Sequence, residues 1–298
     1  MEFSQHNMTD LFKGFSTLVN RGLGTVYTGW KDWANEVRSG TLIQSYPQMI
    51  LNGSMREWIG DRVINHVGTQ KMDVMNRDFE NTVCVERNAI KDDGYGVYGP
   101  MFEALGTNAG NLWGQLAADA LCSPGNWMDG AAFYGEREFG ESVIDNSMGA
   151  VELTIANYEA ARARMMGFCG ADGKPLLLIP DTLVCGPLLE GKAKTIFNAE
   201  TVAVDGVQVS NIHKGECRID MCPWLVGVRA KYWFLVCTTR GVKPFILQKR
   251  EENPLQRLDQ EDDENVFYHR EFIYGLHYRG ASAAVIPQLV IGAFPPNS

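Results

Sequence analysis

The chain is short of basic residues, and this shortage argues against one large class of function. It has 27 Lys and Arg against 36 Asp and Glu, a formal net charge of −9 over 298 residues. Proteins that wrap nucleic acid present clustered cations to the phosphates. The chain is therefore a poor candidate for wrapping nucleic acid, although it could still face DNA across a gap without binding it.

Long apolar runs are also missing. No stretch approaches the ~18 apolar residues that a membrane-spanning helix needs. Residues 1–10 are polar and lack the apolar core of a signal peptide. These absences predict a protein that has no membrane partner and that is made and used in a cytosol.

The spacing of the cysteines does not indicate a disulfide framework. All seven are scattered and mostly set among apolar neighbours, a pattern typical of buried thiols in a reducing compartment. Cys217 and Cys222 are the closest pair, and neither has a Cys or His partner at zinc-site spacing. We predict buried thiols and no metal site.

Catalytic signatures are absent as well. Residues 170–174 hold a Gly-x-x-Gly-Lys fragment, but without the spacing and the Ser or Thr of a phosphate loop. No Gly-x-Ser-x-Gly elbow occurs, and no helical histidine pair is available. We predict no cofactor and no catalytic residue. Catalytic geometry need not be local in sequence, so the alternative is a soluble α+β enzyme using His213, Cys217 and Asp220.

What the chain does contain is one strong helix signal. Apolar residues recur at steps of three and four from Met101 to Ala120, which makes one apolar stripe. Pro100 suits the first helical position, and residues 123–125 (SPG) end the pattern. The spacing predicts a helix over 100–120.

A second face of this predicted helix is lined with glycine. Gly106, Gly110 and Gly114 recur at every fourth residue, although each glycine costs ~1 kcal/mol against Ala in a helix. Either another backbone comes close to this face, or the glycines are merely tolerated.

Further signals follow the long helix. Thr154 is a good N-cap for a helix over 154–166, with Leu153 and Tyr158 as a hydrophobic staple and Gly167 as a left-handed end. Another helix is predicted over 187–196. Asp205-Gly206, between alternating valines, predicts a hairpin. Residues 250–265 are charged and are interpreted as a solvated loop.

The region before the long helix looks different. Apolar and polar residues alternate near Met72 and again near Val83, with turn-forming residues between them, which predicts a long hairpin over 66–92. A lone two-stranded hairpin is marginal in water, so it needs a neighbour. Residues 1–40 are interpreted as an arm with a short helix that buries its aromatic residues on something else.

The order of elements is helix, strands, helix, strands, without regular βαβ alternation, and this predicts an α+β fold. A hydrophobic content of 45% supports a sizeable core. We expect a main domain with a smaller one inserted between about residues 142 and 239.

Several stretches of the chain resemble the major head subunits of Mu-like bacteriophages. Residues 56–62 (REWIGDR) resemble that family's REW-x-G-x-R stretch. The further similar stretches, which keep the family's order, are 76–83 (NRDFENTV), 85–93 (VERNAIKDD), 129–133 (DGAAF), 243–250 (KPFILQKR), 263–267 (DENVF), 271–275 (EFIYG), 279–280 and 288–289. The chain departs from the pattern at His277, where an acid is expected, and at Pro287, where an aromatic is expected.

The resemblance implies the Hong Kong 97 type of capsid fold. It assigns 1–65 to an N-terminal arm and lead-in, 66–92 to an extended loop, 93–141 to a peripheral domain with a spine helix, 142–239 to an axial domain, and 240–298 to the returning peripheral strands. It also implies a shell-building subunit that forms hexamers and pentamers, rather than an enzyme. Another virion part, such as a decoration or tail protein, is a third possibility.

The same resemblance predicts where copies of the chain meet. The candidate assembly residues are Lys71, Arg77, Phe79, Glu86 and Arg87 in the predicted loop, and Gly106, Gly110 and Gly114 on the spine helix. If a neighbouring arm or loop lies on the glycine face, replacing Gly110 with Leu should stall assembly and leave the monomer folded. The expected partners are further copies, a portal, a scaffold or protease, and a decoration protein, with assembly in the host cytoplasm and residence in the virion.

Overall fold

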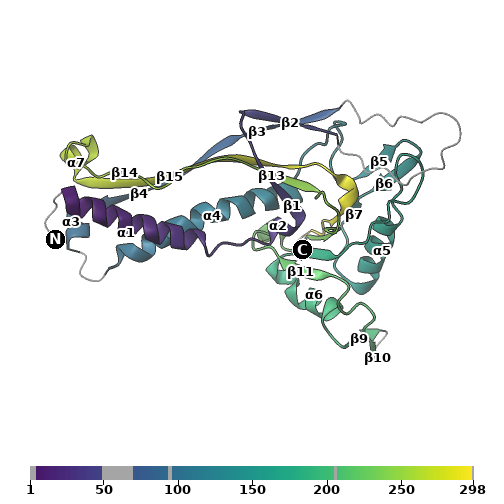
Figure 1. Cartoon of the computed structure of the whole chain (residues 1–298). Coiled ribbons are helices and arrows are strands. Elements are labelled where there is room, and N and C mark those ends of the chain that lie inside the picture. Colours follow the sequence, from purple (N-terminus) through teal and green to yellow (C-terminus); the bar gives the residue numbers. More distant parts are fainter. Residues whose placement is uncertain (1–4, 49–69, 93–95, 205–206, 297–298) are drawn as a thin grey trace.

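A computed structural model describes residues 5–48, 70–92, 96–204 and 207–296. It shows a long, narrow part beside a more compact one (Figure 1). Helices and strands alternate irregularly, which confirms the predicted α+β class. Residues 49–69 lie outside the described residues. They include the end of the predicted lead-in (1–65) and the start of the predicted extended loop (66–92).

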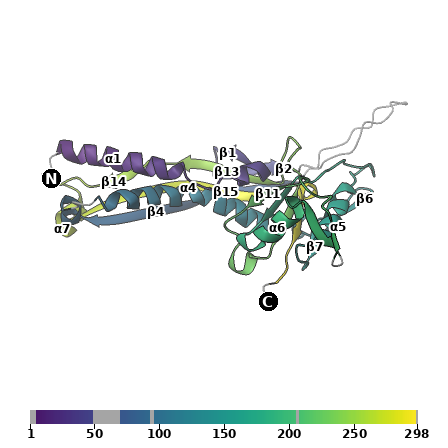
Figure 2. The same ribbon diagram turned by 90° about the horizontal axis from the view of Figure 1, so that it is seen from below.

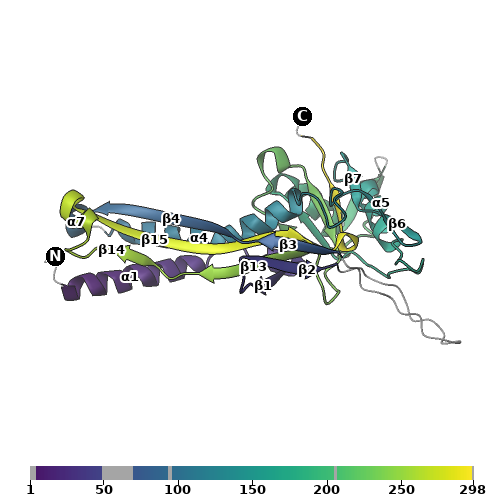
Figure 3. The ribbon, with the colours of Figure 1, turned by 90° about the horizontal axis from the view of Figure 1, so that it is seen from above.

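A long sheet forms the narrow part. Its strands are β1 (Ala34–Arg38), β13 (Phe245–Glu252), β15 (Glu271–Ala284) and β14 (Gln256–Leu258), and β4 (Arg77–Glu86) pairs with β15. Figure 3 shows β4 and β15 running side by side along the molecule. Inward and outward positions alternate along β15 for ten residues, as expected for a sheet with one covered face.

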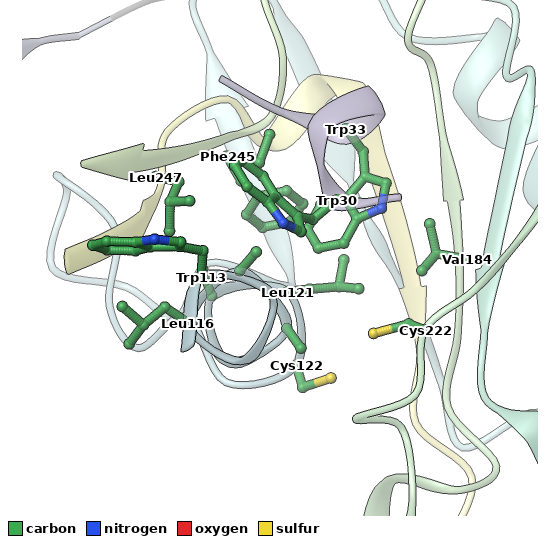
Figure 4. Close-up of a cluster of buried hydrophobic side chains, with 14 of the residues drawn as sticks. Trp30, Trp33, Trp113, Leu116, Leu121, Cys122, Val184, Cys222, Phe245 and Leu247 are labelled. Atoms are coloured by element: carbon green, nitrogen blue, oxygen red, sulfur yellow. The ribbon is translucent and has the colours of Figure 1, made fainter. Parts of the chain in front are cut away.

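The spine helix covers that face. Helix α4 (Tyr98–Cys122) buries Phe102, Leu105, Trp113 and Leu121, among others, and packs against β15. The prediction over 100–120 is confirmed, and the helix ends at residues 123–125 as expected. Trp30, Trp33 and Phe245 join its end in a buried cluster, seen in Figure 4.

The N-terminal helix differs from the prediction. Helix α1 (Gln5–Leu23) has 19 residues and lies along α4 of the same chain (Figure 2). The rings of Phe15 and Phe102 stack with their centroids 3.8 Å apart. The arm therefore buries aromatic surface on its own body. It then leads through α2 (Trp30–Trp33) into β1, which runs parallel to β13.

The compact part has its own sheet. Its order is β11 (Arg218–Met221), β8 (Thr182–Cys185), β12 (Trp233–Val236), β16 (Val290–Ala293) and β7 (Ser147–Gly149). The three central strands are buried throughout. We expected every segment after 240 to return to the first sheet, but β16 pairs with β12 of the second. A strand of four apolar residues can be buried in either sheet, so its sequence does not show which strand it pairs with.

Helices α5 (Ile155–Met166) and α6 (Glu190–Phe197) belong to the compact part, with a short 3-10 turn (Pro187–Leu189) leading into α6. The cap at Thr154 is confirmed, because its hydroxyl accepts a hydrogen bond from the Asn157 N–H at 3.2 Å. Gly167 ends α5, but its φ of −83° is not left-handed.

Two predictions on strands have different outcomes. The hairpin around 205–206 is confirmed by the antiparallel pairing of β9 (Thr201–Val204) with β10 (Val207–Ser210). The solvated loop over 250–265 is wrong in part, because β13 extends to Glu252, β14 follows, and α7 (Glu264–His269) begins at the end of that range. A charged stretch can form edge strands when its side chains face solvent.

The hairpin predicted over 66–92 is wrong. Strand β3 (Lys71–Met75) pairs with β2 (Ile43–Pro47), and β4 pairs with β15. Only Asn76 separates β3 from β4, and one residue cannot close a hairpin turn. The turn-forming residue types at 77 and 78 are exposed within a strand. The projecting hairpin is therefore β2–β3, and β4 belongs to the body. The remaining two-stranded pair is β5 (Glu136–Phe139) with β6 (Ser142–Asp145).

Candidate assembly surfaces

The β2–β3 hairpin exposes apolar side chains that none of the residues described by the structure covers. Ile43 and Met75 lie directly opposite each other in the antiparallel pair, and their exposed fractions are 49% and 58%. Leu42 beside them is also exposed. Lys71 is the first residue of β3 and is exposed. Its ammonium nitrogen lies 3.9 Å from the Asp73 carboxylate. Exposed apolar clusters of this kind mark contact surfaces.

Strand β4 carries two more candidates. Arg77 is exposed, and its guanidinium lies 5.5 Å from the centre of the Phe79 ring. Phe79 is half-buried and faces Tyr278 across the sheet. A groove of about 400 Å³ runs between β4 and α4, lined by Phe79, Asn108 and Leu112 among others. The structure therefore brings Arg77 and Phe79 together, but on the body rather than on the hairpin.

Glu86 and Arg87 lie at the far end of β4, away from the other loop candidates. Glu86 is exposed, and the Arg87 side chain lies 3.7 Å from the Glu261 carboxylate. Helix α7 at the same end exposes Phe267 and Tyr268, whose rings meet edge to face at 5.0 Å. Sequence patterns missed this aromatic pair, because the segment after the predicted charged loop over 250–265 was interpreted as strand-like and not as an exposed helix.

The glycine face has a different occupant from the one expected. A Cβ atom on Gly106 would collide with the Val19 carbonyl of α1, and one on Gly110 would lie 2.6 Å from the Val26 side chain. A Cβ on Gly114 would lie 2.7 Å from the Trp224 ring. The sequence left open whether another backbone approaches this face or the glycines are merely tolerated. A backbone approaches at Gly106 and side chains at Gly110 and Gly114, and all of them belong to this chain. These three glycines are packing residues of the monomer.

The compact part exposes several aliphatic side chains. They come from β10, from the residues just after it, and from the 3-10 turns at 187–189 and 227–229, and they contrast with the fully buried strands of the sheet. Exposed residues of this group include Leu188, Val207, Val209, Ile212, Val226 and Val228.

The residues of the enzyme alternative do not form a catalytic group. The His213 ring nitrogens lie 2.9 Å from carboxylate oxygens of Glu159 and Glu216. Burial raises the pKa of the Cys217 thiol to about 11, the opposite of what a nucleophile needs. The Asp220 carboxylate is occupied by hydrogen bonds from Tyr27 and Trp33.

The described residues also offer no metal site, since no three His, Cys, Asp or Glu side chains among them are grouped to hold an ion. Within the same residues, no helix is long and apolar enough to span a membrane. What the described part of the chain supplies is a set of exposed apolar side chains on an elongated body.

Residues 8–138, 143–225 and 226–294 match the family model of the Mu-like prophage major head subunit gpT. The chain belongs to this family. It is 24% identical over 269 residues to the Mu-like prophage FluMu major head subunit of Haemophilus influenzae, and 22% identical over 274 residues to the major capsid protein of Escherichia phage Mu. These alignments cover 90% and 91% of this chain, and 67% and 68% of the two relatives.

Solved capsids share the head subunit's fold. A chain of the bacteriophage JBD30 procapsid superposes with a TM-score of 0.60 at 22% identity, covering 99% of this chain and 77% of that chain. A virus-like particle from Pyrococcus furiosus gives a TM-score of 0.54 at 11% identity, with 94% and 98% covered. The fold is the Hong Kong 97-like capsid fold. The head subunit is thus a major capsid protein of a tailed phage and a structural protein rather than an enzyme.

Proposed function

We propose that this head subunit closes an icosahedral shell around double-stranded DNA by packing into hexamers and pentamers, with the β2–β3 hairpin as the contact to a neighbouring copy. The observation that carries this proposal is the exposed cross-strand pair Ile43 and Met75. Identical heterologous contacts around a rotation axis close into rings. Individual contacts can be weak, because each subunit makes many of them.

The parts of the chain then take distinct roles. The long sheet with α4 forms the peripheral domain, and the sheet with α5 and α6 forms the axial domain, whose exposed aliphatic residues meet symmetry-related copies. The extended loop is the hairpin built on β2 and β3. Lys71 belongs to this loop, whereas Arg77, Phe79, Glu86 and Arg87 offer contacts from the peripheral domain.

The proposed contents and partners of the shell rest on the net charge of the chain and on its similarity to known capsids. A net charge of −9 suits a lumen that encloses DNA without holding it, since tight phosphate binding needs clustered cations. One JBD30 capsid is described as decorated with minor capsid protein trimers, and we extend a decoration partner to this chain. The other proposed partners are a portal and a scaffold or protease. Assembly is proposed to take place in the host bacterial cytoplasm.

The test places a charge on the hairpin. Ile43→Lys and Met75→Lys should leave the monomer as stable as the wild type, because both side chains are already about half exposed. They should abolish the shells or sheets that the wild-type chain forms on overexpression, as imaged by electron microscopy. The matched controls Ile43→Val and Met75→Leu keep the surface apolar and should assemble. Normal shells from both lysine variants would refute the hairpin contact.

A further inference from the structure

One buried glutamine on the body touches both strands of the projecting hairpin. Gln248 lies on β13 and has no exposed surface. Its Oε1 accepts a hydrogen bond of 2.8 Å from the Tyr46 hydroxyl on β2. Its Nε2 donates to the Asn76 Oδ1 at 2.6 Å and reaches the Val74 carbonyl on β3 at 3.5 Å. Every polar group of the amide is thereby used.

The partner Asn76 is the single residue between the body strand β4 and the hairpin strand β3, and it is buried. Its Nδ2 donates to the Thr41 carbonyl at 2.8 Å and to the Ser39 hydroxyl at 3.1 Å. Its backbone N–H donates to the Leu42 carbonyl at 2.9 Å. The junction residue therefore fastens the entry of β2 to the exit of β3, and Gln248 fastens both to the body.

Part of the hairpin is packed on the body, because Tyr46 and Val74 are buried, but this packing leaves a space open beside β3. A hollow of about 300 Å³ lies between β3 and the end of β15, where the body presents the small side chains of residues 281–284. Dispersion contacts fall away quickly across a gap, so the hollow adds little to the apolar packing that Tyr46 and Val74 supply. A buried hydrogen bond, in contrast, is satisfied in one geometry only and is costly when broken.

We propose that Gln248 is the positioning residue that sets the direction in which the β2–β3 hairpin leaves the body. The proposal rests on the proposed function, because the direction matters only if the hairpin contacts a neighbour. With the three hydrogen bonds in place, every copy offers Ile43 and Met75 at the same angle. Without them the hairpin samples several angles, and neighbouring copies meet with different curvature.

The experiment compares three variants in the full chain. Gln248→Met keeps the length of the side chain and removes all its hydrogen bonds, and Tyr46→Phe removes one of them. Ser45→Ala is the matched control, because the Ser45 hydroxyl bonds to Asp73 within the hairpin and, among the described residues, makes no hydrogen bond to the body. The first readout is amide hydrogen exchange of Ser39 and Asn76 in the unassembled chain, and the second is the distribution of particle diameters.

We expect Gln248→Met to speed exchange at Ser39 and Asn76 at least tenfold, with the β15 amides unchanged, and to turn uniform shells into shells of mixed diameter or tubes. Tyr46→Phe should shift both readouts in the same direction, and it decides the matter should Gln248→Met not fold. Ser45→Ala should match the wild type. A residue with a merely structural role would lower the yield of shells without changing their diameter.

Uniform shells of wild-type diameter from Gln248→Met, or unchanged exchange at the junction, would overturn the proposal, as would equal effects from Ser45→Ala. A wild-type chain that forms no particles would instead refute the proposed function. The exchange readout would still decide whether Gln248 holds the hairpin.

Discussion

The hydroxyl of Tyr27 donates a hydrogen bond of 2.6 Å to the carboxylate of Asp220, and so ties the segment after α1 to the sheet of the compact part. The Trp33 indole N–H reaches the same oxygen at 2.7 Å. Burial, together with the nearby Cys222 and Asp220, holds the pKa of Tyr27 well above its usual range, so the hydroxyl keeps its proton. One carboxylate thus joins the two parts of the molecule.

Replacing Asp220 with Ala should therefore destabilise the whole chain. The buried Trp33 and the half-buried Tyr27 lose their acceptor, at up to about 1–3 kcal/mol for each group left unsatisfied. Asp220→Asn keeps an acceptor oxygen and should cost less than Asp220→Ala. Denaturant unfolding of the unassembled variants measures the difference. Equal midpoints for the wild type and Asp220→Ala would contradict the role assigned to this carboxylate.

A methyl group on the glycine face should loosen α1. Gly106→Ala forces a Cβ against the Val19 carbonyl, and such overpacking costs typically ~1–3 kcal/mol. The matched control is Gly14→Ala on α1, where a Cβ meets nothing within 4 Å and helix propensity favours Ala by up to ~1 kcal/mol. Thermal unfolding of the monomer should thus move in opposite directions for the two variants. A stable Gly106→Ala monomer that fails to assemble would restore the earlier view that a neighbour lies on this face.

Some of the fold was predictable because the relevant signals are local. The spine helix repeats its apolar positions over many turns, and Thr154 supplies a cap within three residues of its partner. The occupant of the glycine face could not be predicted, because any close backbone needs the same absence of Cβ atoms. Sequence alone does not distinguish α1 of the same chain from an arm of another.

The pairing of the strands was predicted incorrectly. The candidate residues on β4 were therefore assigned to the extended loop instead of the long sheet. Alternation near Met72 and Val83 correctly indicates two strands, but a strand's pattern reports which face is buried and not which strand lies beside it. The partner of β3 lies 24 residues or more upstream in β2, and that of β4 lies close to the C-terminus. Ile43 and Met75 were consequently overlooked. Residues 43–47 (IQSYP) do not alternate between apolar and polar types, so no period-two pattern marked β2 as a strand.

Acid should weaken the contact between Asp129 and Arg137. Partial burial works to raise the pKa of Asp129, but hydrogen bonds from the Arg137 guanidinium, at 2.6 Å, and from the Ala131 N–H outweigh it, and the pKa is lowered. A carboxyl with a lowered folded-state pKa contributes stability above its unfolded pKa of about 3.9, and this is lost as pH falls through the folded value.

Asp129→Asn should consequently be less stable than the wild type at neutral pH, by about 1–3 kcal/mol, and should lose less further stability on acidification below about pH 4. Urea midpoints measured at neutral and acid pH check both parts. Parallel pH profiles for the wild type and Asp129→Asn would show that this carboxyl does not contribute to the acid sensitivity.

The thiols should fall into two classes in the native chain. Cys84 is exposed on β4 and Cys169 is half-buried, while the other five are buried, namely Cys122, Cys185, Cys217, Cys222 and Cys237. Burial raises the pKa of Cys122, Cys185 and Cys222 to about 12. The thiolate is the species that reacts with the reagent. These three thiols should therefore react slowly, because they are buried and because they stay protonated. An aromatic disulfide reagent at mildly alkaline pH should titrate at most two thiols in the folded chain and seven after unfolding. Cys84→Ser should remove the faster of the two native reactions, and rapid reaction of three or more thiols in the folded chain would contradict the burial of this core.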